Sequence, residues 1–259
     1  MAADPSSQSP GEREQTFISH LIELRARLLR CILCVVVFFL VLGYFANDVY
    51  RLVAAPALEH LHGNNAMIAT EVGSAFFAPL ELAFYLSLYA AMPYILYQVW
   101  AFISPGLYDN ERRFALPLLI SSILLFYTGI LFAFFIVLPM FFGFMATTVP
   151  EGVAIMTDIR HYLDFVLSMF LAFGLAFEVP VLTILLVWSG IISTAVLRRS
   201  RPYIIIAAFV IGAILTPPDV LSQILLSVPL WLLFELGLFM AARFEGRKDS
   251  EQAQSVLPP

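Results

Sequence analysis

The sequence predicts an all-α integral membrane protein with six transmembrane helices, both termini in the cytoplasm, and short fifth and sixth helices that form a hairpin. Three observations predict this class: the composition, the long apolar runs and the spacing of the basic residues. Of the 259 residues, 61% are hydrophobic and 13% are charged, whereas soluble domains average roughly 45–50% apolar and about 25% charged residues. Because a soluble surface needs more polar side chains than this chain has, lipid must surround most of it.

Four apolar runs are long enough to be transmembrane helices, each of which needs about 20 residues to cross a hydrocarbon layer roughly 30 Å thick. Within these runs Glu81 and Glu178 are isolated acidic residues. The runs cover residues 31–46, 76–102, 114–145 and 165–188. The third run is so long that its helix should tilt or project beyond the bilayer.

A fifth apolar region, residues 203–242, is too long for one span and short for two. The positive-inside rule resolves its topology, because short loops rich in Lys and Arg stay in the cytoplasm. Two apolar runs lie between the first and second basic clusters, and two lie between the second and third. We therefore expect residues 203–242, between the third and fourth clusters, to cross the membrane twice as well. The clusters lie at residues 25–30, 112–113, 198–201 and 243–248. The turn of this hairpin is expected at Thr216-Pro217-Pro218-Asp219, since two consecutive prolines cannot continue a helix.

The ends of the chain are predicted to differ from the membrane domain. Residues 1–16 read as a disordered cytoplasmic N-terminus, residues 17–245 as the six-helix domain, and residues 246–259 as a disordered cytoplasmic tail. The membrane domain begins with an amphipathic helix that lies at the membrane surface. Glu23 and Arg27 lie four residues apart on its charged face, a spacing that favours an ordinary surface ion pair.

Polar side chains within spans are candidate functional residues, because they are costly in lipid. Glu178 is the strongest candidate. It precedes Pro180, whose ring leaves the carbonyl of residue 176 without a helical partner, so a protonated Glu178 could also serve as a local donor. Gln223 lies one turn after Asp219, and the two could contact a partner helix, although Asp219 also suits a helix cap. Glu235 is either functional or simply near the membrane interface.

Several classes of function are disfavoured by the sequence. The net charge of -5 argues against binding to nucleic acid. Cys31 and Cys34 lie inside an apolar run, and His60 and His62 form too small a ligand set for a metal site. The chain contains none of the common hydrolase or nucleotide-binding motifs, so we expect no enzyme activity, cofactor or metal. An alternative function is a proton-coupled small-molecule carrier, although we find no paired repeat of the kind common in carriers.

Five segments carry a resemblance to a known family. They are His20-Leu-Ile-Glu-Leu-Arg25, Pro105-Gly-Leu-Tyr-Asp-Asn-Glu-Arg-Arg113, Phe177-Glu-Val-Pro180, Thr216-Pro-Pro-Asp219 and Phe234-Glu-Leu-Gly237. With these segments in order and in their expected places, residues 16–245 resemble the TatC family. The resemblance implies the core receptor of the twin-arginine translocase, in the bacterial inner membrane, driven by the proton-motive force.

The resemblance also implies partners and sites. The partners are twin-arginine signal peptides of folded cargo proteins, single-span proteins of the TatA and TatB type, other TatC copies and the lipid bilayer. Glu23 and Glu111 would receive the arginines, with Phe102 and Pro105 bordering them. The other implied positions are Pro56 in the first outside loop, Glu178 in a groove that faces the membrane, and Thr216 with Gln223 at the contact for a partner helix.

Overall fold

The structure, a computed structural model, describes residues 10–48, 50, 73–103, 112–148, 158–215 and 220–255. Every element in these ranges is a helix. Five helical segments of the described chain are long and apolar enough to cross a membrane, and the shorter apolar helix Arg201–Leu215 makes a sixth. The predicted all-α membrane fold with a short fifth helix is confirmed, whereas the sixth helix, Val220–Ser255, is not short.

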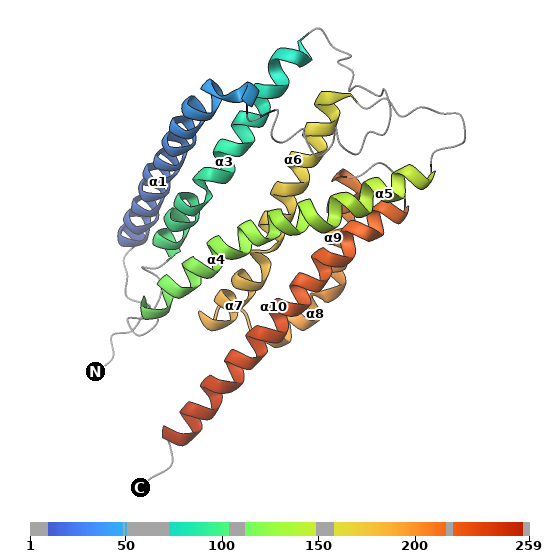
Figure 1. Ribbon diagram of the computed structural model, residues 1–259. Coiled ribbons are helices and arrows are strands. Elements are labelled where there is room, and N and C mark those ends of the chain that lie inside the picture. Colours follow the sequence, from blue (N-terminus) through green and yellow to red (C-terminus); the bar gives the residue numbers. More distant parts are fainter. Residues whose placement is uncertain are drawn as a thin grey trace.

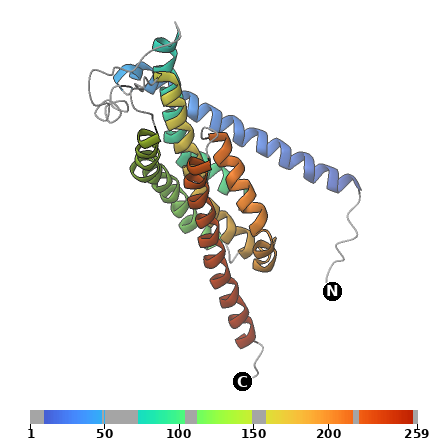
Figure 2. The same cartoon turned by 90° about the vertical axis from the view of Figure 1, so that its right-hand side faces the viewer.

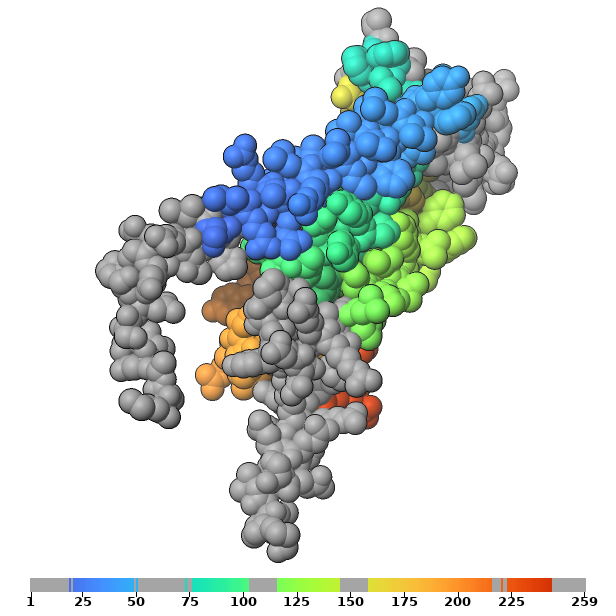
Figure 3. Space-filling view, turned by 90° about the vertical axis from the view of Figure 1, so that its left-hand side faces the viewer, coloured from blue at the N-terminus to red at the C-terminus, as the bar shows by residue number. Residues whose placement is uncertain are grey.

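The first span lies at the edge of the bundle. Helix α1 (Pro10–Tyr44) runs along α3 (Ser74–Ile103) and covers its outer face (Figures 1 and 3). No residue in the most apolar stretch of α1 is buried by the rest of the protein, so lipid must cover most of it. The helix begins earlier than the predicted disordered N-terminus allows, because Pro10 suits a first helical position and the Glu, Arg and Gln that follow favour helix.

The third run forms one long helix that crosses the bundle obliquely (Figure 1), which is the predicted tilt. It consists of α4 (Arg112–Phe132), the π-helical turn η3 (Ala133–Val137) and α5 (Leu138–Thr148). The π-helical turn lies just before Pro139, which has no N–H to donate to the helix. The sequence analysis did not predict this turn.

The fourth run is the most buried span and is broken in its middle. Helix α6 (Ile159–Ala176) and α7 (Val179–Trp188) meet at Phe177 and Glu178, where Pro180 cannot continue the helical ladder. The packing of α6 on α4 is close, because a Cβ on Gly129 would lie 2.5 Å from the Phe173 carbonyl oxygen. Small residues at such contacts let membrane helices approach each other closely.

The last two spans form the predicted hairpin. After the short α8 (Thr194–Arg199), α9 (Arg201–Leu215) and α10 (Val220–Ser255) run antiparallel. They end and begin on either side of the expected turn, which itself lies outside the described residues. Helix α10 continues through residues 246–255, where the sequence analysis placed a disordered tail, since this stretch is rich in helix-forming Glu, Gln, Lys, Arg and Ala.

One end of the bundle gathers several helix ends. Helix α1 begins and α10 ends at this end, and α3 ends and α4 begins there as well (Figures 1 and 2). We call it the terminal end. Residues 104–111, which join α3 to α4, therefore connect two helix ends that lie at the terminal end.

Candidate functional site

The polar site at the terminal end is built around Arg27 on α1. Its Nε and Nη2 atoms both donate to one oxygen, Oε1 of Glu23, at 2.9 and 2.7 Å. The two residues are one helical turn apart, so the pair closes along the surface of α1 as the sequence predicted. Both N–H groups of one edge of the guanidinium thus hold the Glu23 carboxylate.

The same guanidinium also binds α3. Its Nη1 donates to Oε1 of Gln98 at 3.0 Å, and its Nη2 donates to the carbonyl oxygen of Ala101 at 3.1 Å. Gln98 in turn donates through its amide to the hydroxyl of Tyr94, at 2.7 Å. The Arg27 side chain is only 19% exposed. The predicted ion pair of Glu23 and Arg27 is present, but it is more than a surface pair, because Arg27 also joins α1 to α3.

The other residues implied at this site fall on α3 and on the segment that follows it. Phe102 is half-buried in the last turn of α3, next to Ala101. Glu111 and Pro105 lie in residues 104–111, outside the described part of the chain. Among the predicted residues the structure thus brings Glu23 and the end of α3 together. Three further candidates, Pro56, Thr216 and Asp219, also lie outside the described residues.

Glu178 occupies the break between α6 and α7, as the residue just before α7, and is 7% exposed. Its Oε1 has no hydrogen-bond partner among the described residues. The polar side chain that acts on it is that of Ser122 on α4, so its polar surroundings come from another helix. A buried carboxyl with one unsatisfied oxygen is costly, which marks Glu178 as a candidate functional residue.

A short polar row leads from Glu178 toward the terminal end. Ser122 accepts a hydrogen bond of 3.4 Å from the indole nitrogen of Trp100 on α3. Trp100 lies two residues before Phe102 in the last turns of α3. Sequence reasoning missed both Ser122 and Trp100, because neither is ionisable and only the tertiary packing of α3, α4 and α7 brings them to Glu178.

Glu235 has a direct structural partner. Its Oε2 accepts a hydrogen bond of 2.7 Å from Nη2 of Arg201, so the pair joins the start of α9 to α10. The side chains are 25% and 46% exposed, respectively. Glu235 is thus one of the polar contacts between α9 and α10.

Gln223 lies within the hairpin, where its side-chain amide donates to the carbonyl oxygen of Phe209 on α9 at 2.9 Å. One turn later, the Ser227 hydroxyl contacts the carbonyl oxygen of Ala208 at 3.1 Å. Gly212 makes room for this contact, since a Cβ there would lie 2.8 Å from the Ser227 hydroxyl. Of the predicted polar pair, Gln223 therefore packs on α9, whereas Asp219 lies outside the described residues.

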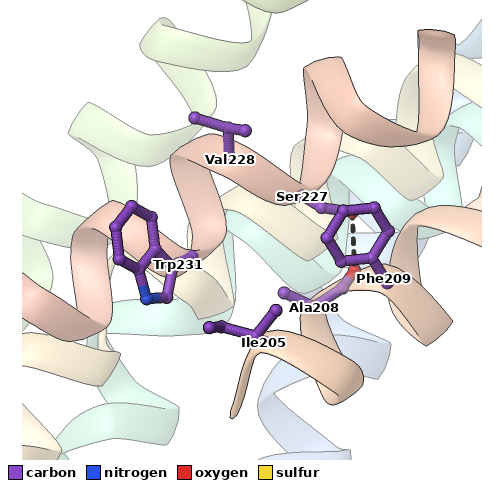
Figure 4. A pocket seen from close by; sticks show the side chains of 6 residues that line it. All are labelled: Ile205, Ala208, Phe209, Ser227, Val228 and Trp231. Carbon is purple, nitrogen blue, oxygen red and sulfur yellow. Dashed lines mark hydrogen bonds between the residues drawn. The ribbon is translucent and has the colours of Figure 1, made fainter. Parts of the chain in front are cut away.

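A hollow of about 140 Å³ opens beside this contact, between α9 and α10 (Figure 4). Trp231 lines it, and its indole N–H is buried without a hydrogen-bond partner among the described residues. Trp231 could not be singled out from the sequence, because tryptophan is common in membrane helices near the interface. The other lining residues are Ile205, Ala208, Phe209, Ser227 and Val228.

These features define a class of protein. The chain is a polytopic helical membrane protein with a carboxylate that binds an arginine at one end and a carboxyl buried within its most central span. Several of its described polar side chains bind groups on other helices.

Comparison with known proteins gives the family. A family model described as "TatC: Sec-independent protein translocase protein (TatC)" matches residues 19–229. The chain is 55% identical over 259 residues to Sec-independent protein translocase protein TatC of Azotobacter chroococcum, with 100% of both chains covered. It is 56% identical over 236 residues to the protein of that name in Escherichia coli strain K12, covering 91% of this chain and 92% of the relative.

A solved structure agrees. "Crystal Structure of Twin Arginine Translocase Receptor- TatC" superimposes with a TM-score of 0.79 at 38% identity, over 86% of this chain and 98% of that chain. The chain therefore belongs to the TatC family. It is a receptor subunit of the Sec-independent, twin-arginine protein translocase rather than an enzyme, and the small-molecule carrier considered as an alternative is not supported.

Proposed function

We propose that the terminal end of the bundle faces the cytoplasm, in the bacterial inner membrane, and receives the paired arginines of signal peptides on folded cargo proteins. The observation that carries this proposal is the binding of the Arg27 guanidinium by Glu23 through two N–H groups, at 2.9 and 2.7 Å. A carboxylate that already holds one arginine, in a side chain 36% exposed, has the chemistry and the access that a second arginine needs.

Arginine suits this task better than lysine. Its planar fork pairs with carboxylates through two parallel hydrogen bonds, whereas a lysine ammonium acts as a point charge. Two carboxylates, Glu23 on α1 and Glu111 before α4, would together receive two neighbouring arginines. The apolar side chains of Phe102, in the last turn of α3, and of Pro105 would lie beside these two carboxylates. The family resemblance, rather than the described geometry, brings Glu111 into this site.

The receptor proposal is tested at Glu111. Glu111→Lys should abolish signal-peptide binding, because it replaces attraction with repulsion, and Glu111→Gln should weaken binding by about 1.5–3 kcal/mol for a lost charge-assisted hydrogen bond. Binding of a labelled peptide to purified protein measures both effects. Glu81→Gln is the matched control, since Glu81 lies on α3 far from its terminal end, near Arg160 of α6. Equal affinity of wild type and Glu111→Lys would remove Glu111 from the site.

Contact and orientation have their own tests. A photocrosslinker at Glu111 should capture a twin-arginine peptide and lose it when both arginines become lysines. Cysteines placed at Ser200, Asp219 and Gly246 should label from the cytoplasm, the outside and the cytoplasm, respectively. Labelling of positions 200 and 246 from opposite sides would contradict the proposed topology.

We propose further that the hairpin of α9 and α10 contacts single-span partners of the TatA and TatB type, near Thr216 and Gln223, in complexes that also contain other copies of this chain. The support is the apolar hollow between the two helices, which the Trp231 ring lines. An apolar hollow on the hairpin offers a partner helix a surface on which to pack closely.

Two variants test this contact. Gln223→Leu and Trp231→Phe should each reduce co-purification of the partners only in part, because an interhelical hydrogen bond contributes about 0.6–2 kcal/mol. Signal-peptide binding should persist in both variants, which controls for misfolding. Unchanged recovery of both partner types would leave Gln223 with only its bond to the Phe209 carbonyl oxygen.

Glu178 completes the proposal as a polar group in a groove that faces the membrane, where it would thin or hydrate the adjacent bilayer. Glu178→Gln keeps the shape of the side chain and removes its capacity to ionise. We expect this variant to bind signal peptide as the wild type does and to transport cargo more slowly in membrane vesicles. A wild-type transport rate would show that ionisation of Glu178 is unnecessary.

A further inference from the structure

Arg27 makes four hydrogen bonds to three residues on two helices. We propose that Arg27 is the positioning residue of the receptor site, fixing the Glu23 carboxylate against the end of α3 so that it can pair with an incoming arginine. This inference rests on the proposed function of Glu23. It assigns to Arg27 a role in recognition that goes beyond holding α1 in place.

The attachment of Arg27 to α3 does not depend on Glu23. Gln98 is 5% exposed, and its own amide is held by the Tyr94 hydroxyl, so the oxygen it offers to Arg27 is fixed in place. The Ala101 carbonyl lies in the last turn of α3, where the helix dipole favours a cation. Arg27 would therefore stay on α3 whether or not Glu23 is bound to a signal arginine.

Polar contacts are especially important for the position of α1 on α3. No residue in the most apolar stretch of α1 is buried, so the position of α1 on α3 is set by side-chain packing, such as that of Phe39 on Phe84, together with hydrogen bonds. The bonds from Arg27 to Gln98 and Ala101 fix that position at the terminal end. Glu23, one turn from Arg27, is then held at a defined height relative to Phe102.

The convergence of two donors on one carboxylate oxygen fixes its orientation as well as its place. The Nε and Nη2 hydrogens of Arg27 lie along one edge of a planar group, so Oε1 of Glu23 is held from two directions. A lysine at position 27 would keep the positive charge but could not reproduce this edge together with the bonds to α3. Arg27→Lys therefore separates the geometry of the residue from its charge.

An opposite role is also conceivable and makes the opposite prediction. If Arg27 competed with the signal peptide for Glu23, weakening its hold on Glu23 would tighten peptide binding. If Arg27 positions Glu23, the same change weakens binding. The two bonds to α3, which hold Arg27 without any contribution from Glu23, favour the positioning role.

The experiment is a titration of a labelled twin-arginine signal peptide against the full-length protein in nanodiscs. Arg27→Lys should weaken binding about tenfold, which is about 1.4 kcal/mol. The matched control is Arg201→Lys, which alters an arginine–glutamate pair between α9 and α10, at 2.7 Å from Glu235, and should stay within about twofold of wild type.

Two readouts distinguish positioning from a merely structural role. The double variant of Glu23→Gln with Arg27→Lys should bind no more weakly than Glu23→Gln alone, because residues that act through one another are not additive. The preference for a twin-arginine over a twin-lysine peptide should also fall in Arg27→Lys. If Arg27→Lys does not fold, Gln98→Leu replaces it, with an expected weakening of about threefold that is again absent in the Glu23→Gln background.

The outcomes separate the two proposals. Weaker binding in Glu23→Gln together with unchanged or tighter binding in Arg27→Lys would overturn the role of Arg27 and leave the receptor site standing. Fully additive losses of binding in the double variant would also overturn the role of Arg27 and leave the receptor site standing. Wild-type affinity in Glu23→Gln would instead contradict the proposed function of Glu23, and the role of Arg27 would fall with it.

Discussion

The contact between α7 and α10 and the contact between α1 and α3 are held together in different ways. In the first, a Cβ on Gly237 would lie 2.7 Å from the Cα of Pro180, and Phe234, Leu238 and Ala241 are buried. In the second, α1 buries no residue of its most apolar stretch, and Arg27 ties it to α3 by hydrogen bonds. One contact depends on close steric fit, the other on polar groups.

The difference follows from the solvent. Lipid tails are as apolar as the helices, so burial of apolar surface does not by itself bring two membrane helices together. Helices must either approach closely enough to gain dispersion contacts, as at Gly237, or exchange hydrogen bonds, as at Arg27. A steric contact resists any added atom, whereas a polar contact can be released and remade, which suits a helix that carries a receptor group.

The steric contact is challenged most strongly by Gly237→Ala. The added methyl group would meet a backbone atom of Pro180 that cannot move aside, so we expect a loss of about 3 kcal/mol, at the upper end for overpacking. The midpoint of thermal unfolding in detergent measures this loss. Gly143→Ala is the control, because nothing lies within 4 Å of the added atom. Equal midpoints for the two variants would contradict the steric account.

The polar contact is challenged by Arg27→Leu, which keeps much of the side chain and removes its four hydrogen bonds. We expect a loss of about 1–2 kcal/mol and a separation of α1 from α3 at the terminal end. Spin labels at the exposed Leu29 and Tyr97 would report a broader distance distribution. An unchanged distribution would mean that packing alone positions α1.

An interior hydrogen bond gives an intermediate case. The buried Tyr89 hydroxyl on α3 donates to the carbonyl oxygen of Leu167 on α6 at 2.6 Å. Tyr89→Phe should lower stability by about 1 kcal/mol, as measured by thermal unfolding. Tyr203→Phe, at a side chain that is mostly exposed, should change it by less than about 0.5 kcal/mol. A smaller loss of stability for Tyr89→Phe than for Arg27→Leu would support this ranking of the two contacts. An equal or larger loss would contradict it.

The smallest effect is expected for Arg201→Ala. Its pair with Glu235 also joins two helices, but a single hydrogen bond between partly exposed side chains contributes only about 0–1 kcal/mol. Thermal unfolding at low and high salt measures this contribution, which salt should reduce further. A loss as large as that of Arg27→Leu would show that burial and the number of bonds do not distinguish the two arginines.

The sequence determined the topology. The basic clusters and the apolar runs gave six crossings by parity, and Thr216-Pro217-Pro218-Asp219 falls in the gap between α9 and α10. This succeeds because hydrocarbon thickness and charge act on each segment separately. The same local reasoning identified Glu178 as costly in its span, and showed that Pro180 leaves the carbonyl of residue 176 without a helical partner, before any neighbouring helix was known.

Tertiary structure alone decided which groups meet. Glu23 and Arg27 looked like a surface ion pair because their spacing is local, whereas Gln98 and Ala101 lie more than 70 residues further along the chain. Ser122 and Trp231 carry no charge, so no rule about ionisable residues finds them. Such partners depend on how the helices pack in three dimensions. The periodicity of residues along one helix shows which residues share a face, but not which other helix that face contacts.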